Sequence, residues 1–213
     1  MTFATTIGML AIIPAAIYLF GRFPPVKAAM LTMFIGVLFM PAGGAAFDPP
    51  LVPPIDKYGM TTLCMFVLGL SKAASRFAAA RSNRQVLFTL LFVVVIGVGA
   101  AQTNQDLLRY GSWRVTFVPP MSFPWDTLSI TIRLWFGMLL PFVVGRMYLR
   151  TSKDLRTFFV MLATFGLIYV PLCLWEVRMS PQLHSQVYGF APHDFLQQVR
   201  AEGYRPMVFL GHG

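Results

Sequence analysis

Side chains that could act as acids, bases or anion ligands are concentrated between Glu176 and Gly213. This segment holds all 3 histidines of the chain together with three arginines: His184, His193, His212, Arg178, Arg200 and Arg205. Histidine titrates near neutral pH and can transfer a proton, whereas arginine binds phosphate oxygens through two parallel hydrogen bonds. Histidine beside arginine therefore suits acid–base chemistry on a substrate with a diphosphate leaving group. Each histidine can equally be a hydrogen-bonded loop residue.

The spacing of the histidines does not indicate a metal site. They are nine and nineteen residues apart, and both cysteines, Cys64 and Cys173, lie in apolar stretches outside this segment. Zinc sites usually show short ligand spacings, such as two histidines four residues apart on a helix. The chain also has no Gly-x-Ser-x-Gly elbow and no Walker-type phosphate loop. We therefore expect no metal and no other cofactor.

The composition indicates an integral membrane protein. Hydrophobic residues make up 56% of the chain and charged residues only 12%, which water cannot cover. The net charge of +9 would suggest nucleic acid in a soluble domain. In a membrane protein, a basic excess instead reports topology and contact with anionic membrane lipids. We therefore expect lipid as a partner and no nucleic acid.

Six apolar stretches approach the roughly 17 to 25 residues that a helix needs to cross the hydrocarbon core. They cover about residues 3–20, 26–40, 58–74, 85–101, 128–149 and 155–175. The predicted fold is an all-α, polytopic transmembrane helix bundle of about six spans in residues 1–175, followed by a partly helical tail, residues 176–213. Within the tail, residues 193–203 have the pattern of a short amphipathic helix. Residues 207–210 begin a seventh apolar stretch.

The loops between these stretches alternate in charge. The first, third and fifth loops carry ten basic residues and one acid, whereas the other loops and the tail carry six basic residues and seven acids. Cytoplasmic loops are enriched in Lys and Arg. The pattern predicts a multi-pass protein with its N-terminus and residues 176–213 on the non-cytoplasmic side, which is the periplasm if the membrane is a bacterial inner membrane.

Arg133 is the one permanent charge inside a predicted span. A guanidinium in hydrocarbon is costly, so such a residue usually faces a bundle interior, a cavity or a ligand. Arg133 also lies only about 8 Å from the outer end of its span, at about 1.5 Å of rise per residue, so its side chain can instead snorkel to the surface. The outer loop of residues 102–126 offers a weaker candidate, because Trp113 and Arg114 could hold a sugar ring or a phosphate or could belong to an interfacial aromatic belt.

The tail carries a series of short motifs. In order they are residues 178–184 (Arg-Met-Ser-Pro-Gln-Leu-His), Tyr188-Gly189, residues 193–195 (His-Asp-Phe), residues 198–200 (Gln-Val-Arg), residues 203–206 (Gly-Tyr-Arg-Pro), Val208-Phe209 and residues 211–213 (Gly-His-Gly). Together they resemble the outer-loop region of bacterial O-antigen ligase and polymerase-like membrane proteins. The resemblance is closest to the exopolysaccharide-polymerising branch.

This resemblance implies a metal-independent glycosyltransferase of the bacterial inner membrane. Such an enzyme transfers an oligosaccharide on the periplasmic side, from a polyprenyl-diphosphate carrier to a growing glycan or a lipid-linked acceptor, alongside other polysaccharide-assembly proteins. Carried over by position, Arg178, Arg200 and Arg205 become candidates for binding the diphosphate, and Arg133 joins them as a charge within a span. The three histidines become candidates for activating or binding the acceptor.

The length of the chain and two other functions bear on this prediction. Members of the family are about twice as long, so we expect the sequence to be an N-terminal fragment, in which activity would be incomplete.

A transporter or flippase of the lipid-linked glycan would also use several spans and a basic cavity. A non-catalytic membrane subunit of a polysaccharide-export complex would use the outer loops for assembly, and its histidines would be replaceable.

Overall fold

The fold is almost entirely helical. The computed structural model describes residues 2–42, 46–47, 54–81, 84–106, 108–110, 116–118, 120–121, 124–192, 194–195, 198–200 and 203–211. Its helices are α1 (Phe3–Leu10), α2 (Ile12–Arg22), α3 (Pro25–Phe39), α4 (Lys57–Lys72), α5 (Ala74–Arg81), α6 (Arg84–Thr103), α7 (Trp125–Leu134), α8 (Leu140–Tyr148), α9 (Ser152–Met179) and α10 (Leu183–Tyr188), with a π-helix, η1 (Trp135–Leu139), between α7 and α8. Strands β1 (Leu108–Tyr110) and β2 (Thr116–Val118) form one antiparallel hairpin, and β3 (Val199–Arg200) and β4 (Gly203–Tyr204) form another.

Four helical segments in the described part of the chain are long and apolar enough to cross a membrane. They are Phe3–Arg22, Arg84–Thr103, Trp125–Tyr148 and Ser152–Met179. The predicted all-α membrane architecture is therefore supported. The predicted spans 26–40 and 58–74 correspond to α3, of 15 residues, and α4, of 16 residues, which are shorter than the other four. The count of about six spans stays a prediction.

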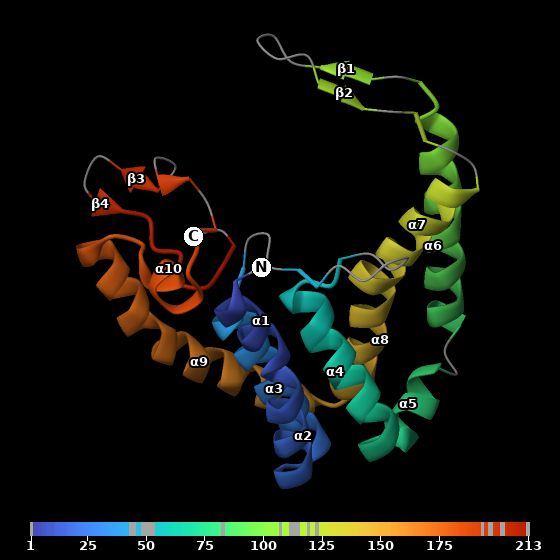
Figure 1. Cartoon of the computed structure of the whole chain (residues 1–213). Coiled ribbons are helices and arrows are strands. Elements are labelled where there is room, and N and C mark those ends of the chain that lie inside the picture. The colour runs from blue at the N-terminus through green and yellow to red at the C-terminus, as the bar shows by residue number, and fades with distance from the viewer. Residues whose placement is uncertain are drawn as a thin grey trace.

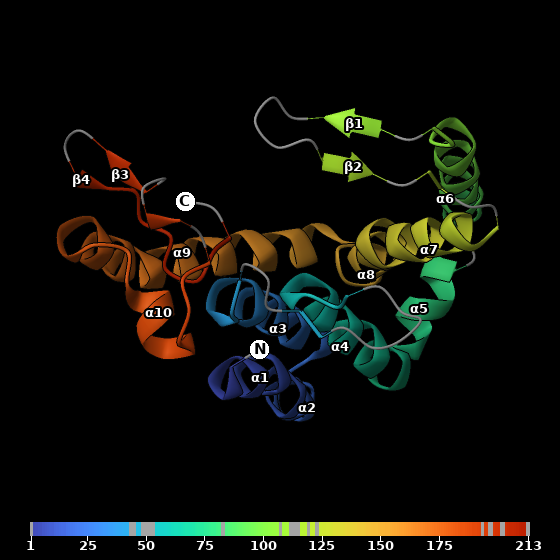
Figure 2. The same cartoon turned by 45° about the horizontal axis from the view of Figure 1, so that its top comes forward.

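The helices α2, α3 and α4 pack together at the centre of the molecule. Helix α8 packs on α4, α6 and α7 pair beside it, and α9 crosses α3 and extends away to the other side, where it carries α10 and the β3–β4 hairpin (Figures 1 and 2). The central core includes Phe20, Met30, Met65, Met147 and Tyr148. The Tyr148 hydroxyl donates to the carbonyl of Met65 at 2.9 Å, so this buried ring keeps a partner for its polar atom.

A proline explains the π-helix between α7 and α8. Pro141 has no N–H group, so the carbonyl of Gly137 cannot receive the usual helical hydrogen bond. The helix is locally wider by one residue per turn, and the N–H of Leu140 bonds to the carbonyl of Trp135, five residues earlier. Such π-helical turns are often found at functional sites. Here the π-helix begins two residues after Arg133.

The tail differs from the sequence prediction in two places. The predicted helix at residues 193–203 is wrong, because Val199 pairs with Tyr204 in the β3–β4 hairpin. Gly203 has φ of +148°, which a residue with a side chain rarely adopts, and it allows the chain to reverse. The apolar residues Met207, Val208 and Phe209 form a turn that is buried against the rest of the protein, and they do not begin another helix in the described residues.

Glycine allows α3 and α4 to approach closely. A Cβ atom on Gly36 would lie 2.7 Å from Cγ2 of Thr61, and the Thr61 hydroxyl is itself held by a 2.6 Å hydrogen bond to the carbonyl of Lys57. The threonine therefore cannot move aside easily, and helix contacts in membranes commonly use such small residues.

We predict that Gly36→Ala destabilises the protein by about 1–3 kcal/mol, because the added methyl group overpacks this contact. Thermal unfolding in detergent measures the effect. Gly99→Ala in α6 is the matched control, since a Cβ there meets no atom within 4 Å, and it should leave the unfolding temperature unchanged or raised. Equal unfolding temperatures for Gly36→Ala and the wild type would contradict this account of the packing.

Candidate functional site

Arg133 lines a cavity of about 550 Å³, with mixed polar and apolar walls, between the first turn of α4 and the π-helix. The cavity is lined by residues from the loop before α4, from α4, and from the α7–η1–α8 segment: Pro54, Ile55, Asp56, Tyr58, Gly59, Thr62, Arg133, Phe136, Gly137 and Pro141. We call it the Arg133 cavity. It brings a cation, a carboxylate, a phenol and a threonine hydroxyl to the same space. These groups can bind an anion and the hydroxyl groups of a sugar.

Arg133 and Asp56 line the same cavity without neutralising each other. No described carboxylate forms an ion pair with Arg133, whose side chain is exposed to the cavity. Asp56 is the N-cap of α4, and its Oδ1 accepts a 2.8 Å hydrogen bond from the N–H of Gly59. Its other carboxylate oxygen makes no hydrogen bond to a described residue. The cavity therefore presents an anion-binding group and a proton-accepting group to the same ligand.

An apolar groove lies directly beside the Arg133 cavity, and the two share the side chain of Phe136. The groove has a volume of about 400 Å³ and is lined only by apolar residues from α4, α5, α6, η1 and α8: Leu63, Phe66, Phe77, Val86, Leu90, Trp135, Phe136, Leu139, Leu140 and Val143. The Arg133 cavity and the apolar groove thus lie on either side of one aromatic side chain, so polar and apolar binding surfaces are neighbours.

A second polar cluster fixes the tail to the bundle. Lys57 is 2% exposed, and its Nζ donates to the carbonyls of Val37 at 2.8 Å and Phe209 at 2.7 Å. Glu176 is 1% exposed, and its Oε2 accepts from the N–H groups of Met207 and Val208, both at 2.7 Å. We call Lys57, Glu176, His184 and residues 207–209 the tail clamp, in which the His184 ring lies 6.2 Å from the ring of Phe209. Burial lowers the pKa of Lys57 to about 8, although the adjacent Asp56 carboxylate acts in the opposite direction.

His184 lies inside this clamp and uses both of its ring nitrogens. Its Nε2 accepts from the N–H of Ala42 at 3.0 Å, so Nδ1 carries the proton and donates to the carbonyl of Phe190 at 2.9 Å. The side chain is 2% exposed. Burial lowers the pKa of His184, and the charge of Lys57 adds to this effect, whereas the Phe190 hydrogen bond and Glu176 oppose it. In this structure His184 is a neutral residue that joins α10 to the loop after α3.

Most of the other predicted site residues lie away from the Arg133 cavity. Arg178 and Arg205 are exposed, in the last turn of α9 and just after β4. These elements lie on the opposite side of α3 and α4 from α7 (Figures 1 and 2). Only the backbone of Arg200 is described, in β3. Trp113, Arg114, His193 and His212 lie outside the described residues, so their predicted roles stay predictions.

The sequence interpretation missed Asp56, Lys57 and Glu176. One signal was available for each of them. Asp56 directly precedes a helical pattern, as N-cap residues do. Lys57 and Glu176 are charged residues next to the ends of two predicted spans, where charged side chains are commonly solvated. Their burial depends on the tail folding back, which no local pattern reveals.

Comparison of the chain with protein-family models, curated proteins and solved structures finds no match. Among the described residues, no three His, Cys, Asp or Glu side chains lie together as a metal site. The fold defines a mostly helical protein with four described segments that are long and apolar enough to cross a membrane. The resemblance of the tail to O-antigen ligase and polymerase-like proteins stays a prediction.

We predict that acid weakens the tail clamp through His184. The pKa of His184 is lower in the folded protein than its ordinary value of 6.5. As the pH falls through 6.5, the unfolded chain therefore binds more protons at this residue than the folded protein does, and the free energy of unfolding decreases. Thermal unfolding in detergent between pH 7 and pH 5 measures this loss. His184→Gln keeps a donor and an acceptor but does not titrate, so its unfolding temperature should fall less over the same range. Parallel pH profiles for wild type and His184→Gln would show that His184 is not the titrating group.

Proposed function

We propose that the protein is a membrane glycosyltransferase, or part of one, that holds a polyprenyl-diphosphate-linked oligosaccharide in the Arg133 cavity and transfers its glycan to an acceptor. The observation that carries this proposal is Arg133 itself. It is a cation in a membrane-crossing segment that lines a polar cavity and has no described counter-ion. The motifs of the tail favour the O-antigen ligase and polymerase class, and exopolysaccharide synthesis within it.

The physical chemistry of the cavity favours a diphosphate headgroup. A guanidinium near hydrocarbon is stabilised by an anion that it can bind through two hydrogen bonds, and a diphosphate offers several oxygens for this. The neighbouring apolar groove suits the hydrocarbon part of the same carrier. A free nucleotide sugar would use the cavity but would have no use for the groove. Tyr58 and Thr62 on the cavity wall can contact the sugar.

The proposed reaction assigns different roles to the two charged residues of the cavity. An acceptor hydroxyl oxygen attacks the anomeric carbon of the carrier-linked sugar, and the bond between that carbon and the diphosphate oxygen breaks. Arg133 stabilises the negative charge that develops on the departing diphosphate. The free oxygen of Asp56 takes the hydroxyl proton, which later passes to water. Asp56 thus replaces His184 as the proposed base, because both nitrogens of His184 are already hydrogen-bonded.

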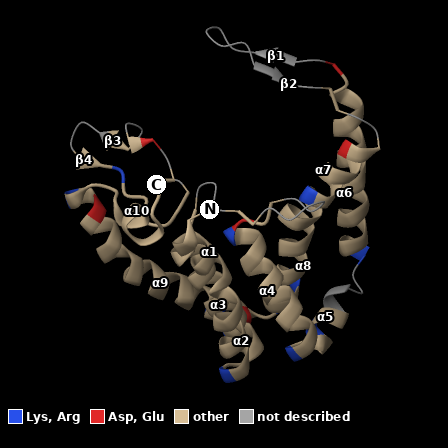
Figure 3. Cartoon of the chain, viewed as in Figure 1, with Lys and Arg blue, Asp and Glu red and all other residues tan. Residues whose placement is uncertain are grey.

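The distribution of charge supports a proposed orientation with the Arg133 cavity towards the periplasm. Basic residues mark the other end of the bundle: Arg22 in the last turn of α2, Lys72 in that of α4, Arg84 at the start of α6 and Arg146 in the last turn of α8 (Figure 3). That end would face the cytoplasm under the positive-inside rule. The cavity would then meet the carrier after it has been flipped across a bacterial inner membrane.

Binding of undecaprenyl diphosphate to the protein in lipid nanodiscs tests the proposal. We predict that Arg133→Gln weakens binding by roughly tenfold or more, because a charge-assisted bidentate contact is lost. Arg22→Gln is the matched control, since Arg22 is also exposed but lies at the opposite end of the bundle. Binding that is equal in all three proteins would remove the Arg133 cavity as the carrier site.

Asp56→Asn separates binding from chemistry in the same system. Asparagine caps a helix about as well as aspartate, so α4 should stay intact. We expect unchanged affinity for the carrier, with glycan transfer reduced on the order of 10²- to 10⁴-fold, using lipid-linked glycan extracted from the source cells. A flippase would translocate the carrier in reconstituted vesicles without transferring its glycan. Normal transfer by Asp56→Asn would exclude Asp56 as the base.

A further inference from the structure

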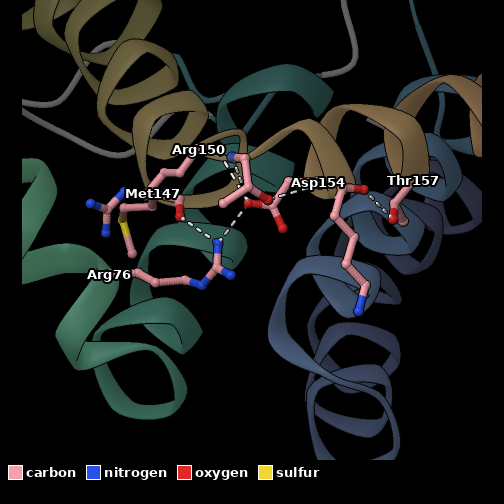
Figure 4. A network of polar contacts seen from close by, with 7 residues as sticks. Arg76, Met147, Arg150, Asp154 and Thr157 are labelled. Atoms are coloured by element: carbon pink, nitrogen blue, oxygen red, sulfur yellow. Dashed lines mark hydrogen bonds and ion pairs between the residues drawn. The ribbon is translucent and has the colours of Figure 1, made fainter.

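A separate network of polar contacts joins α5 to the turn between α8 and α9, at the basic end of the bundle (Figure 4). Nη1 of Arg76 donates to Oδ2 of Asp154 at 3.1 Å and to the carbonyl of Met147 at 3.5 Å. The same Asp154 oxygen accepts from the N–H groups of Arg150 at 3.3 Å and Thr151 at 3.1 Å. Asp154 is 5% exposed, so the guanidinium of Arg76 is held in a fixed position against this turn.

A small cavity of about 210 Å³ opens beside this network, lined by Arg76, Arg150 and Thr151. Arg76 uses one guanidinium nitrogen on Asp154 and Met147, and its other nitrogens make no hydrogen bond to described residues. The Arg150 side chain is exposed and has no described carboxylate partner. Asp154 pairs with the guanidinium of Arg76 alone, and the Arg150 side chain adds a second positive charge to the cavity wall. The cavity keeps a net positive charge that the protein itself does not neutralise.

We propose that this cavity binds the phosphate of an anionic phospholipid headgroup. Its position argues for a lipid, because the turn between α8 and α9 connects two membrane-crossing segments and therefore lies near the headgroups. Leu155 and Phe159, which are 44% and 61% exposed, lie in the first turns of α9 and provide an apolar surface for an acyl chain. Arginine pairs suit phosphate because each guanidinium can form two parallel hydrogen bonds.

The bound phospholipid would stabilise the junction of α5, α8 and α9. The first turn of α9 is already capped, since Thr151 and Asp154 form a reciprocal capping box, so the phosphate is not needed to satisfy helix N–H groups. Its contribution is to offset the repulsion between Arg76 and Arg150. This site is independent of the proposed glycosyl transfer, because it lies at the other end of the bundle and shares no residue with the Arg133 cavity.

Native mass spectrometry of the protein with phosphatidylglycerol or phosphatidylcholine tests the proposal. We expect wild type to retain phosphatidylglycerol in preference to phosphatidylcholine, and Arg150→Gln to reduce this retention roughly tenfold. Arg156→Gln is the matched control. It removes the same charge from the same end of the bundle, and Arg156 is exposed but does not line the cavity. Its retention of phosphatidylglycerol should equal that of wild type.

Three results would contradict the proposed phospholipid site. Equal losses for Arg150→Gln and Arg156→Gln would show that only the diffuse positive charge attracts lipid. Equal retention of the two lipids by wild type would show that the cavity does not recognise the net negative charge of the headgroup. Displacement of phosphatidylglycerol by millimolar inorganic phosphate, with no dependence on the acyl chains, would assign the cavity to a free anion. None of these measurements uses a glycan, so their outcome is separate from that of the transferase proposal.

Discussion

The arrangement of the tail depends on the contact between the Glu176 carboxylate and the backbone N–H groups of Met207 and Val208. A buried carboxylate is tolerated only when its oxygens receive hydrogen bonds, and this one receives three, including one from Leu183. Lys57 lies on the other side of the same turn, where its Nζ donates to the carbonyl of Phe209. These contacts hold a polar, irregular segment against apolar helices, where its backbone groups would otherwise lack partners.

The first turn of α4 connects this clamp with the Arg133 cavity. Lys57 points into the clamp, whereas its neighbours Asp56 and Tyr58 line the cavity. Successive residues on a helix point about 100° apart, so adjacent positions can serve two different sites. A change in the position of the tail would therefore act directly on the helical turn that carries the proposed base. His184 stays out of this chemistry, since its hydrogen bonds to Ala42 and Phe190 are part of the clamp.

The two ends of the bundle differ in the surroundings of their arginines. At one end Arg133 has no described carboxylate within ion-pair distance, and its cavity shares Phe136 with an apolar groove. At the other end Asp154 fixes Arg76, and a smaller cavity lies beside the pair. The same residue type thus serves a large site for a proposed substrate and a small site for a proposed lipid. The volume of the cavity and the placement of the nearest carboxylate separate the two proposed roles.

The sequence by itself determined the helical class, the four segments that are long and apolar enough to cross a membrane, and the unusual position of Arg133. Apolar run length and an isolated charge are local properties. It did not determine the β3–β4 hairpin, since the apolar pattern of residues 193–203 fits a short helix equally well and the pairing of Val199 with Tyr204 decided the outcome. It also could not show that Lys57, Glu176 and His184 are buried together. Only the tertiary structure decided that, because residues far apart in the sequence lose their water when the tail folds onto α4 and α9 and must then satisfy one another.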